Sequence, residues 1–205
     1  QVLDLVQTTS FVDNIFRILG SGDATRKIAF EADSITAGNT RTATMPDRNL
    51  SLTDITLATP QASTSGTSID FTSIPSGIKR ITVMFNEIST NGTSILRVQL
   101  GDAGVIETTG YAGAVDSTAW STSTGIDLNT GSVAAGLYSG VITLTLLNSS
   151  TNVWVVSGLF ARTDTAAGFR TTGRKALSAV LDRVRITTVN GVDTFDAGEI
   201  NICYE

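Results

Sequence analysis

The chain has 205 residues and a formal net charge of −5; 41% of its residues are hydrophobic, 16% are charged and none is histidine. This hydrophobic content excludes a disordered chain, and the lack of histidine excludes Ser-His-Asp and Cys-His nucleophiles and His-ligated metal sites. A single cysteine, Cys203, excludes an internal disulfide and a Cys-rich zinc site. The acidic balance argues against nucleic acid or an anionic lipid surface as a partner, because both bind clustered Lys and Arg.

Hydroxyl residues are frequent, since 32 Thr and 20 Ser make up 52 of the 205 residues. Thr suits the half-buried surface of a pleated sheet, and both residue types compete with the backbone hydrogen bonds of a helix. The chain also lacks a run of about 18 uncharged apolar residues, the length that a membrane-spanning helix needs. We therefore expect an all-β protein without membrane insertion.

The first 52 residues divide into two parts. Residues 1–10 have no initiator Met and no helix-capping signature, and we expect them to be the end of an upstream segment. Residues 11–52 contain three short strand patterns, at 14–19, 27–32 and 40–45, joined by Gly-containing turn clusters. A three-stranded sheet of this size cannot bury its apolar face against itself. It must therefore lie on another sheet or on copies of itself.

Residues 11–52 also carry a distinctive series of residues. The series is Ile18, Asp23, Thr25, Arg26, Lys27, Phe30, Ile35, Thr36, Gly38, Thr40, Arg41, Thr42, Thr44, Pro46, Asp47 and Leu50. It resembles a short module of the tail-fibre and tailspike proteins of tailed bacteriophages. The resemblance implies a trimeric β-prism shaft or collar, in which three copies supply the missing faces. The residues alone leave open an ordinary three-stranded meander that leans on the downstream domain.

The segment 53–68 changes in composition after Leu57. Its apolar residues give way to Ala, Thr, Ser and Gly, with Pro60 among them. This composition is typical of a linker or an extended lead-in. We therefore expect residues 53–68 to join the shaft module to a separate domain, 69–205.

Residues 69–205 show strand patterns with turn signals between them. We predict three hairpins, which pair 80–85 with 95–100, 138–148 with 152–161, and 183–189 with 199–205. Two of them contain an Asn-Gly dipeptide, at 91–92 and 190–191, which is a strong hairpin signal. Further strands are predicted near 69–72, 105–108 and 174–181. About nine strands without a helical pattern indicate a two-sheet antiparallel β-sandwich of jelly-roll type.

This second domain carries a resemblance as well. The matching stretches are Pro75, 79–85, 89–94, 99–101, 109–111, 195–198 and 200–205. They are similar to the C-terminal domains of phage tail fibres and other phage tail proteins. The resemblance implies a trimeric head at the distal end of a fibre, located in the tail of the virion and therefore on an extracellular particle.

The longest predicted loop, 110–132, is the candidate for ligand binding, because loops on a rigid β scaffold usually carry the binding residues. It contains Tyr111 and Trp120, whose rings offer apolar faces to a sugar, and Asp116 and Asn129, which can bond its hydroxyl groups. These four residues form the predicted ligand-binding site. The alternative for Trp120 is that it folds inward to cover the open end of the sandwich or lies at a subunit interface.

Only carboxylates could carry chemistry in a chain without histidine, and they lie in turn-like sequences. Asp102 stands in a Gly-Asp-Ala-Gly turn, and Asp193 and Asp196 flank another turn, where Asp is expected for its bonds to its own backbone. The long repeats of depolymerase tailspikes are missing too. We therefore predict no enzyme activity, no catalytic residue, no cofactor and no metal.

Three functional hypotheses follow. The first is a non-enzymatic receptor-binding tip, a homotrimer that binds a bacterial surface glycan or an outer-membrane protein and gains avidity from three sites. The second is a purely structural tail or baseplate subunit that contacts other phage tail proteins. The third, a glycan hydrolase or deacetylase, ranks last because paired catalytic carboxylates are not evident.

Overall fold

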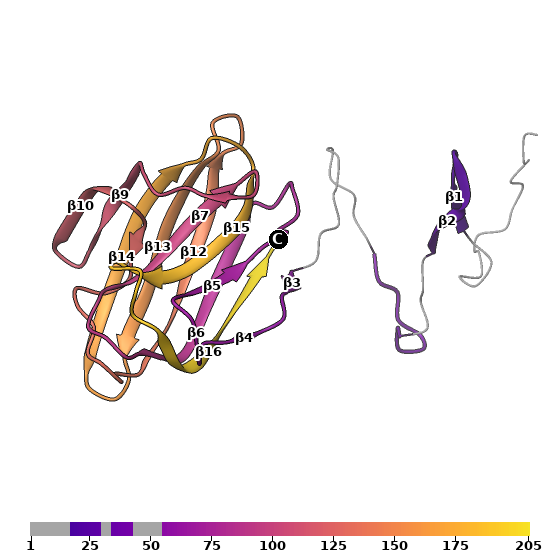
Figure 1. Ribbon diagram of the computed structural model, residues 1–205. Helices are drawn as coiled ribbons and strands as arrows, with labels where there is room; N and C mark the ends of the chain where they lie inside the picture. The colour runs from indigo at the N-terminus through magenta and orange to yellow at the C-terminus, as the bar shows by residue number, and fades with distance from the viewer. Residues whose placement is uncertain (1–16, 30–33, 43–54) are drawn as a thin grey trace, which may run out of the picture. The chain divides into compact units, whose positions relative to one another are not determined.

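The computed structural model describes residues 17–29, 34–42 and 55–205, and the chain divides into two compact units, 1–52 and 53–205 (Figure 1). Every regular element in the described residues is a β-strand. None of these residues belongs to a helix that is long and apolar enough to cross a membrane. The all-β prediction is confirmed.

In the first unit, β1 (Arg17–Gly20) and β2 (Asp23–Ala29) form an antiparallel hairpin. The Asp23 carboxylate accepts hydrogen bonds from the backbone N–H of Thr25, at 2.9 Å, and from its hydroxyl, and so fixes the start of β2. Of the predicted strand at 40–45, residues 40–42 are not in a strand, and 43–45 lie outside the described residues. The described residues therefore contain two strands of this unit, β1 and β2.

The second unit consists of two sheets in which all strand pairs are antiparallel (Figure 1). The larger sheet has nine strands in the order β10-β9-β14-β13-β12-β6-β16-β3, with β4 also on β16, and the smaller has five in the order β11-β7-β15-β5, with β8 also on β7. The strands are β3 (Thr56–Leu57), β4 (Gln61–Ala62), β5 (Ser68–Phe71), β6 (Arg80–Thr90), β7 (Leu96–Asp102), β8 (Val105–Ile106), β9 (Tyr111–Val115), β10 (Thr118–Ser123), β11 (Ile126–Asp127), β12 (Tyr138–Asn148), β13 (Val153–Arg162), β14 (Ala167–Ala176), β15 (Leu181–Thr188) and β16 (Phe195–Tyr204). The arrangement is consistent with the predicted β-sandwich.

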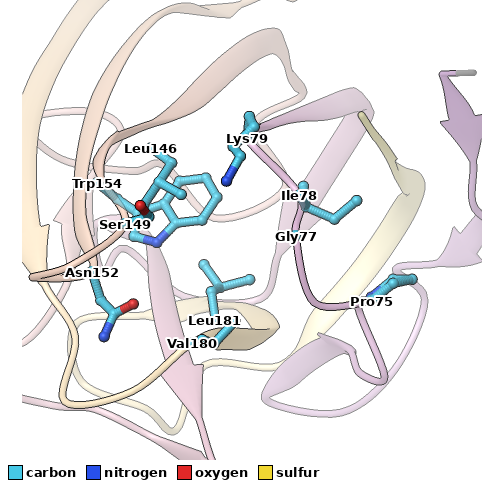
Figure 2. Close-up of a pocket in the computed structure, with 10 residues that line it drawn as sticks. All are labelled: Pro75, Gly77, Ile78, Lys79, Leu146, Ser149, Asn152, Trp154, Val180 and Leu181. Atoms are coloured by element: carbon cyan, nitrogen blue, oxygen red, sulfur yellow. The ribbon is translucent and has the colours of Figure 1, made fainter. Parts of the chain in front are cut away.

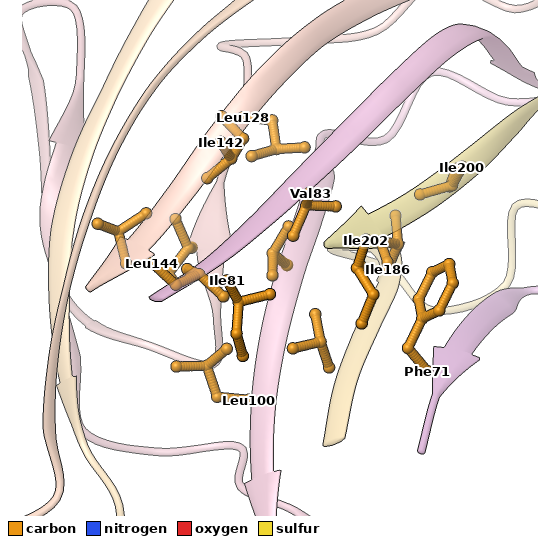
Figure 3. Packing of buried hydrophobic residues seen from close by; sticks show 14 of the residues in the cluster. Phe71, Ile81, Val83, Leu100, Leu128, Ile142, Leu144, Ile186, Ile200 and Ile202 are labelled. Carbon is orange, nitrogen blue, oxygen red and sulfur yellow. The ribbon is translucent and has the colours of Figure 1, made fainter. Parts of the chain in front are cut away.

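The hydrophobic core draws side chains from both sheets. In β12, Ile142 and Leu144 are fully buried, whereas Val141 is 47% exposed, as the alternation of a strand with one covered face requires. Figure 3 shows Ile142 and Leu144 of the larger sheet in one packed cluster with Leu100 and Ile186 of the smaller sheet. Burial of this cluster is the main stabilising term of the second unit.

Two of the three predicted hairpins are wrong. β6 belongs to the larger sheet and β7 to the smaller one, so Asn91-Gly92 connects the sheets instead of closing a hairpin. Asn190-Gly191 likewise connects β15 of the smaller sheet with β16 of the larger one. The dipeptide favours a tight turn, but each flanking strand pairs where its apolar face is covered. Only the β12–β13 hairpin is confirmed.

The two inter-sheet loops hold each other by hydrogen bonds. The Asn91 carbonyl oxygen Oδ1 accepts from the backbone N–H of Thr194 at 2.9 Å. Asp193 Oδ2 accepts from the backbone N–H of Ser94 at 2.9 Å, and Ser94 Oγ accepts from the backbone N–H of Asn190 at 3.0 Å. These bonds form one corner of the sandwich, to which both loops contribute.

The segment predicted as a linker, 53–68, contributes strands to the sandwich. β3 and β4 both pair with β16, and β5, which starts at Ser68, pairs with β15. The Ser63 hydroxyl is buried and donates to the carbonyl of Ala197 at 2.8 Å. Backbone pairing needs no apolar side chain, and for this reason the composition of 53–68 did not indicate strands.

Gly92 is predicted to be essential to the corner between the sheets. A Cβ atom at this position would lie 2.1 Å from the carboxylate of Asp193, which is held by Ser94 and by the Asn190 amide. We expect Gly92→Ala to lower the free energy of unfolding by about 1–3 kcal/mol, because the carboxylate must move and lose these bonds.

The measurement is urea unfolding followed by tryptophan fluorescence, since both tryptophans lie in the second unit. Gly131→Ala is the control, because its Cβ would meet no atom within 4 Å. Equal stability of the two variants would contradict the prediction.

Candidate functional site

The predicted binding loop 110–132 is largely built of strands. β9 pairs with both β14 and β10 at one edge of the larger sheet, and β11 pairs with β7 in the smaller sheet. The prediction of a long open loop is therefore wrong. The Ala- and Gly-rich sequence of β9 carries little hydrophobic signal, but its backbone completes the edge of the sheet through hydrogen bonds to β14.

Tyr111 lies in the core. Its side chain is fully buried, and its hydroxyl accepts from the backbone N–H of Leu100 at 2.7 Å and lies 3.1 Å and 3.0 Å from the carbonyls of Leu100 and Glu107. Burial raises the pKa of Tyr111 well above its ordinary value. The ring is thus part of the packing between the sheets and offers no face to a sugar, contrary to the prediction.

Asn129 has a structural role too. Its side chain is 1% exposed, and its Oδ1 accepts from the backbone N–H of Leu96 at 3.0 Å. Its Nδ2 donates to the carbonyl of Gly131 at 3.1 Å and to Ser132 Oγ at 3.0 Å. With these bonds Asn129 secures the chain after β11 against β7, so it does not lie at a ligand-accessible surface as predicted.

Asp116 and Trp120 lie in the β9–β10 hairpin. Asp116 occupies the turn with a φ of 49°, is exposed, and accepts a hydrogen bond from the backbone N–H of Arg170 at 3.0 Å. The backbone of Trp120 pairs with Gly113, and its side chain is outside what the structure describes. The structure thus keeps these two residues on one edge hairpin, and sugar contact by Trp120 stays a prediction.

A nearly buried ion pair fixes the region around Tyr111. The Lys175 side chain is only 4% exposed, and its ammonium group contacts the Glu107 carboxylate and lies 5.4 Å from the centroid of the Tyr111 ring. Glu107 also accepts from the backbone N–H of Ser178 at 2.7 Å. Burial by itself raises the pKa of Glu107, but the bonds from Lys175 and Ser178 outweigh it and lower the pKa from 4.5 to about 2.

The residues at one end of the sandwich enclose a pocket of about 170 Å³ (Figure 2). We call it the Trp154 pocket, and its lining residues are Pro75, Gly77, Ile78, Lys79, Leu146, Ser149, Asn152, Trp154, Val180 and Leu181. Trp154 comes from β13, and Lys79 directly precedes β6. Ser149 and Asn152 lie in the turn between β12 and β13. The pocket therefore forms where three segments of the chain meet, 75–79, 146–154 and 180–181.

Backbone hydrogen bonds hold the walls of this pocket in place. The carbonyl of Lys79 accepts from Leu146 N–H at 2.8 Å, and the N–H of Lys79 donates to the carbonyl of Glu205 at 2.7 Å. Asn152, in the left-handed region with a φ of 48°, accepts from Leu177 N–H at 3.1 Å through its carbonyl. The backbone bonds of the larger sheet and of the β12–β13 turn thus fix the geometry of the pocket.

The polar side-chain groups of the Trp154 pocket have no hydrogen-bond partner among the described residues. Trp154 is 2% exposed, yet its indole N–H meets no acceptor there. The same holds for the Lys79 ammonium, the Asn152 amide and the Ser149 hydroxyl. Since the lining contains neither Asp nor Glu, the pocket offers donors and apolar contacts but no carboxylate for acid-base chemistry.

No sequence pattern predicted this pocket. Trp154 occupies a buried position in the alternation of β13. The polar neighbours come from a turn and from the segment before β6, which lies more than 70 residues earlier in the chain. Only the turn between β12 and β13, next to Trp154, could have indicated the position of the pocket from the sequence.

The outer face of the larger sheet is a second surface of interest. On β12 and β13, Val141 and Leu159 pair with each other and are 47% and 67% exposed. On β6, β12 and β13 the outward positions around them are uncharged: Ser139, Thr143, Ser157, Ala161, Thr82 and Met84. On β14, the exposed Arg170 pairs with Leu159. A shallow groove of about 480 Å³ crosses this face beside Leu159, Phe169 and Arg170.

The comparisons with known proteins give no relative. The chain matches no protein-family model, no curated protein and no solved structure. Among the described residues there is also no group of three His, Cys, Asp or Glu side chains that could hold a metal ion. The function must therefore be inferred from the two surfaces just described and from the sequence resemblance.

The Glu107–Lys175 pair predicts a specific dependence of stability on pH. Because the folded-state pKa of Glu107 is lowered, its carboxylate stabilises the fold above pH 4.5, and this contribution is lost as the pH falls toward 2. We expect Glu107→Gln to lose about 3 kcal/mol at neutral pH, since Lys175 stays buried without its counter-charge. Over this acidic range the stability of the variant should fall less steeply than that of the wild-type chain.

Urea unfolding at a series of pH values measures both effects. Glu87→Gln removes an exposed carboxylate on β6 and serves as the control. Parallel pH profiles for the wild-type and Glu107→Gln chains would show that the pair does not have this role.

Proposed function

We propose that this chain is the C-terminal part of a bacteriophage tail fibre and that residues 53–205, the head, bind a receptor on the bacterial surface without catalysis. The fibre is a homotrimer in the tail of the virion, and its receptor is a glycan or an outer-membrane protein. Three heads that engage together gain about 10² to 10⁴ in avidity over one site. The proposal combines the sequence resemblance with the surface of the head.

The observation that carries the binding function is the Trp154 pocket. It joins a buried indole N–H, an ammonium group, an amide and a hydroxyl with apolar walls on a rigid β scaffold. Such a mixture of apolar surface and a few convergent polar groups is typical of ligand pockets. The lining of the pocket has no carboxylate, whereas glycoside hydrolysis uses a pair of them. This favours binding of a glycan without hydrolysis.

A second function, a structural subunit that contacts other tail proteins, is favoured by the outer face of the larger sheet. The exposed Val141 and Leu159 lie side by side in an uncharged stretch of three strands. An exposed apolar patch on a sheet usually marks a protein contact. The two functions are separable, because the Trp154 pocket lies between strand ends and this patch lies on the sheet face.

Receptor binding can be tested with the purified, fluorescently labelled chain. We expect saturable binding to some bacterial strains and to the surface polysaccharide of those strains, with displacement by unlabelled chain. Trp120→Ala, on the edge hairpin, measures whether that predicted residue contributes. Strain-independent or absent binding, together with capture of the chain by other tail proteins, would favour the structural function.

The trimer can be tested by the mass of the full chain in solution. Light scattering after size exclusion should give three times the 21.5 kDa of one chain. A monomer at micromolar concentration would contradict both the shaft module and the trimeric head.

A further inference from the structure

We propose that the Trp154 pocket binds one carboxylate-bearing sugar residue, a uronic acid, of a surface glycan. This inference rests on the proposed receptor binding and adds the class of ligand. Four properties of the pocket lead to it: its size, its buried donor, its single charge and its apolar walls.

The size of the pocket restricts the ligand to a single ring. Sites for drug-sized ligands have volumes of about 300 to 1,000 Å³, whereas this pocket holds about 170 Å³. A peptide loop of a protein receptor would need a larger depression. A glycan, by contrast, can insert one residue and leave the rest of the chain outside.

The buried indole N–H of Trp154 needs a hydrogen-bond acceptor, such as an oxygen atom of a ligand. Trp154 is 2% exposed and its N–H has no acceptor among the described residues, and an unpaired buried donor costs free energy. In Figure 2 the indole nitrogen lies on the side of the ring that faces Ser149 and Asn152. A ligand oxygen in the pocket would remove this cost and add a bond.

The positive charge of the pocket lining favours an anionic ligand. Lys79 is the one charged lining residue, and in Figure 2 its ammonium group points toward the indole ring. The neighbouring side-chain carboxylate of Glu205 is paired with Arg80. In a chain with a net charge of −5, this local positive potential favours a ligand that carries negative charge.

A carboxylate fits this charge better than a phosphate. Phosphate sites usually provide several cations or a row of backbone N–H groups, and only one cation lines this pocket. The Asn152 amide and the Ser149 hydroxyl suit the hydroxyl groups of a sugar, and Ile78 and Leu181 suit the C–H groups of its ring. A uronic acid presents all three kinds of group at once.

The test uses the ¹⁵N-labelled full chain, whose two tryptophans give two indole N–H signals in an NMR spectrum. Trp154→Phe identifies the signal of Trp154 by its loss. Glucuronate, glucose and inorganic phosphate are then titrated into the wild-type chain. We expect glucuronate to shift the Trp154 signal at millimolar concentration and to bind at least about tenfold more tightly than glucose or phosphate.

The variants test each group in turn. Lys79→Gln should weaken glucuronate binding about tenfold and reduce the preference over glucose. Asn152→Gly removes the amide but suits the left-handed backbone, and it should also weaken binding. Arg174→Gln, which removes a positive charge from exposed Arg174 on β14, is the matched control and should bind like the wild-type chain.

Three results would overturn the inference: no shift of the Trp154 signal with glucuronate, an equal response to glucose, or unchanged affinity in Lys79→Gln. A stronger response to phosphate would assign the pocket to phosphorylated groups instead. If the chain binds bacteria while glucuronate leaves Trp154 unaffected, receptor binding holds and the ligand class is wrong. If glucuronate binds but bacteria are not bound, the inference holds and the proposed function fails.

Discussion

Apolar side chains that two antiparallel sheets bury between them hold the head of this chain together. Ile142 and Leu144 reach the cluster from the larger sheet, and Leu100 and Ile186 reach it from the smaller one. Each strand has one apolar face, so it must join the sheet in which that face is covered. This constraint outweighs the turn preference of the Asn-Gly dipeptide between β6 and β7. The two strands therefore belong to different sheets.

The same constraint explains where a ligand can bind. Rings on the covered faces, such as Tyr111, become part of the core and have their hydroxyl groups bonded within the chain. At the end of the sandwich, where strands end and turns begin, each sheet covers the inner face of the other only in part. Trp154 lies at such a place, so its ring is nearly buried and also lines a small pocket together with Ser149 and Asn152.

Much of the fold could be predicted from the sequence. The alternation of apolar residues located β5, β6, β7, β12, β13, β15 and β16, and with them the all-β, two-sheet arrangement. It did not locate β9, β10 and β11, because their Ala, Gly, Ser and Thr residues give no alternating hydrophobic signal. Nor could it show that residues 56–57 and 61–62 pair with β16, since those bonds involve only the backbone.

The sequence by itself determined the class of the protein: a β chain rich in hydroxyl residues, without histidine and with one cysteine, which has neither an imidazole group nor an internal disulfide. These conclusions depend only on which residues are present. The tertiary structure alone decided the strand partners and the site. It buried Tyr111 and Asn129, and it brought Lys79 to Trp154 and Asn152 from a distant part of the chain. Such contacts depend on how the two sheets pack, because burial of apolar surface acts over the whole head and no local pattern encodes it.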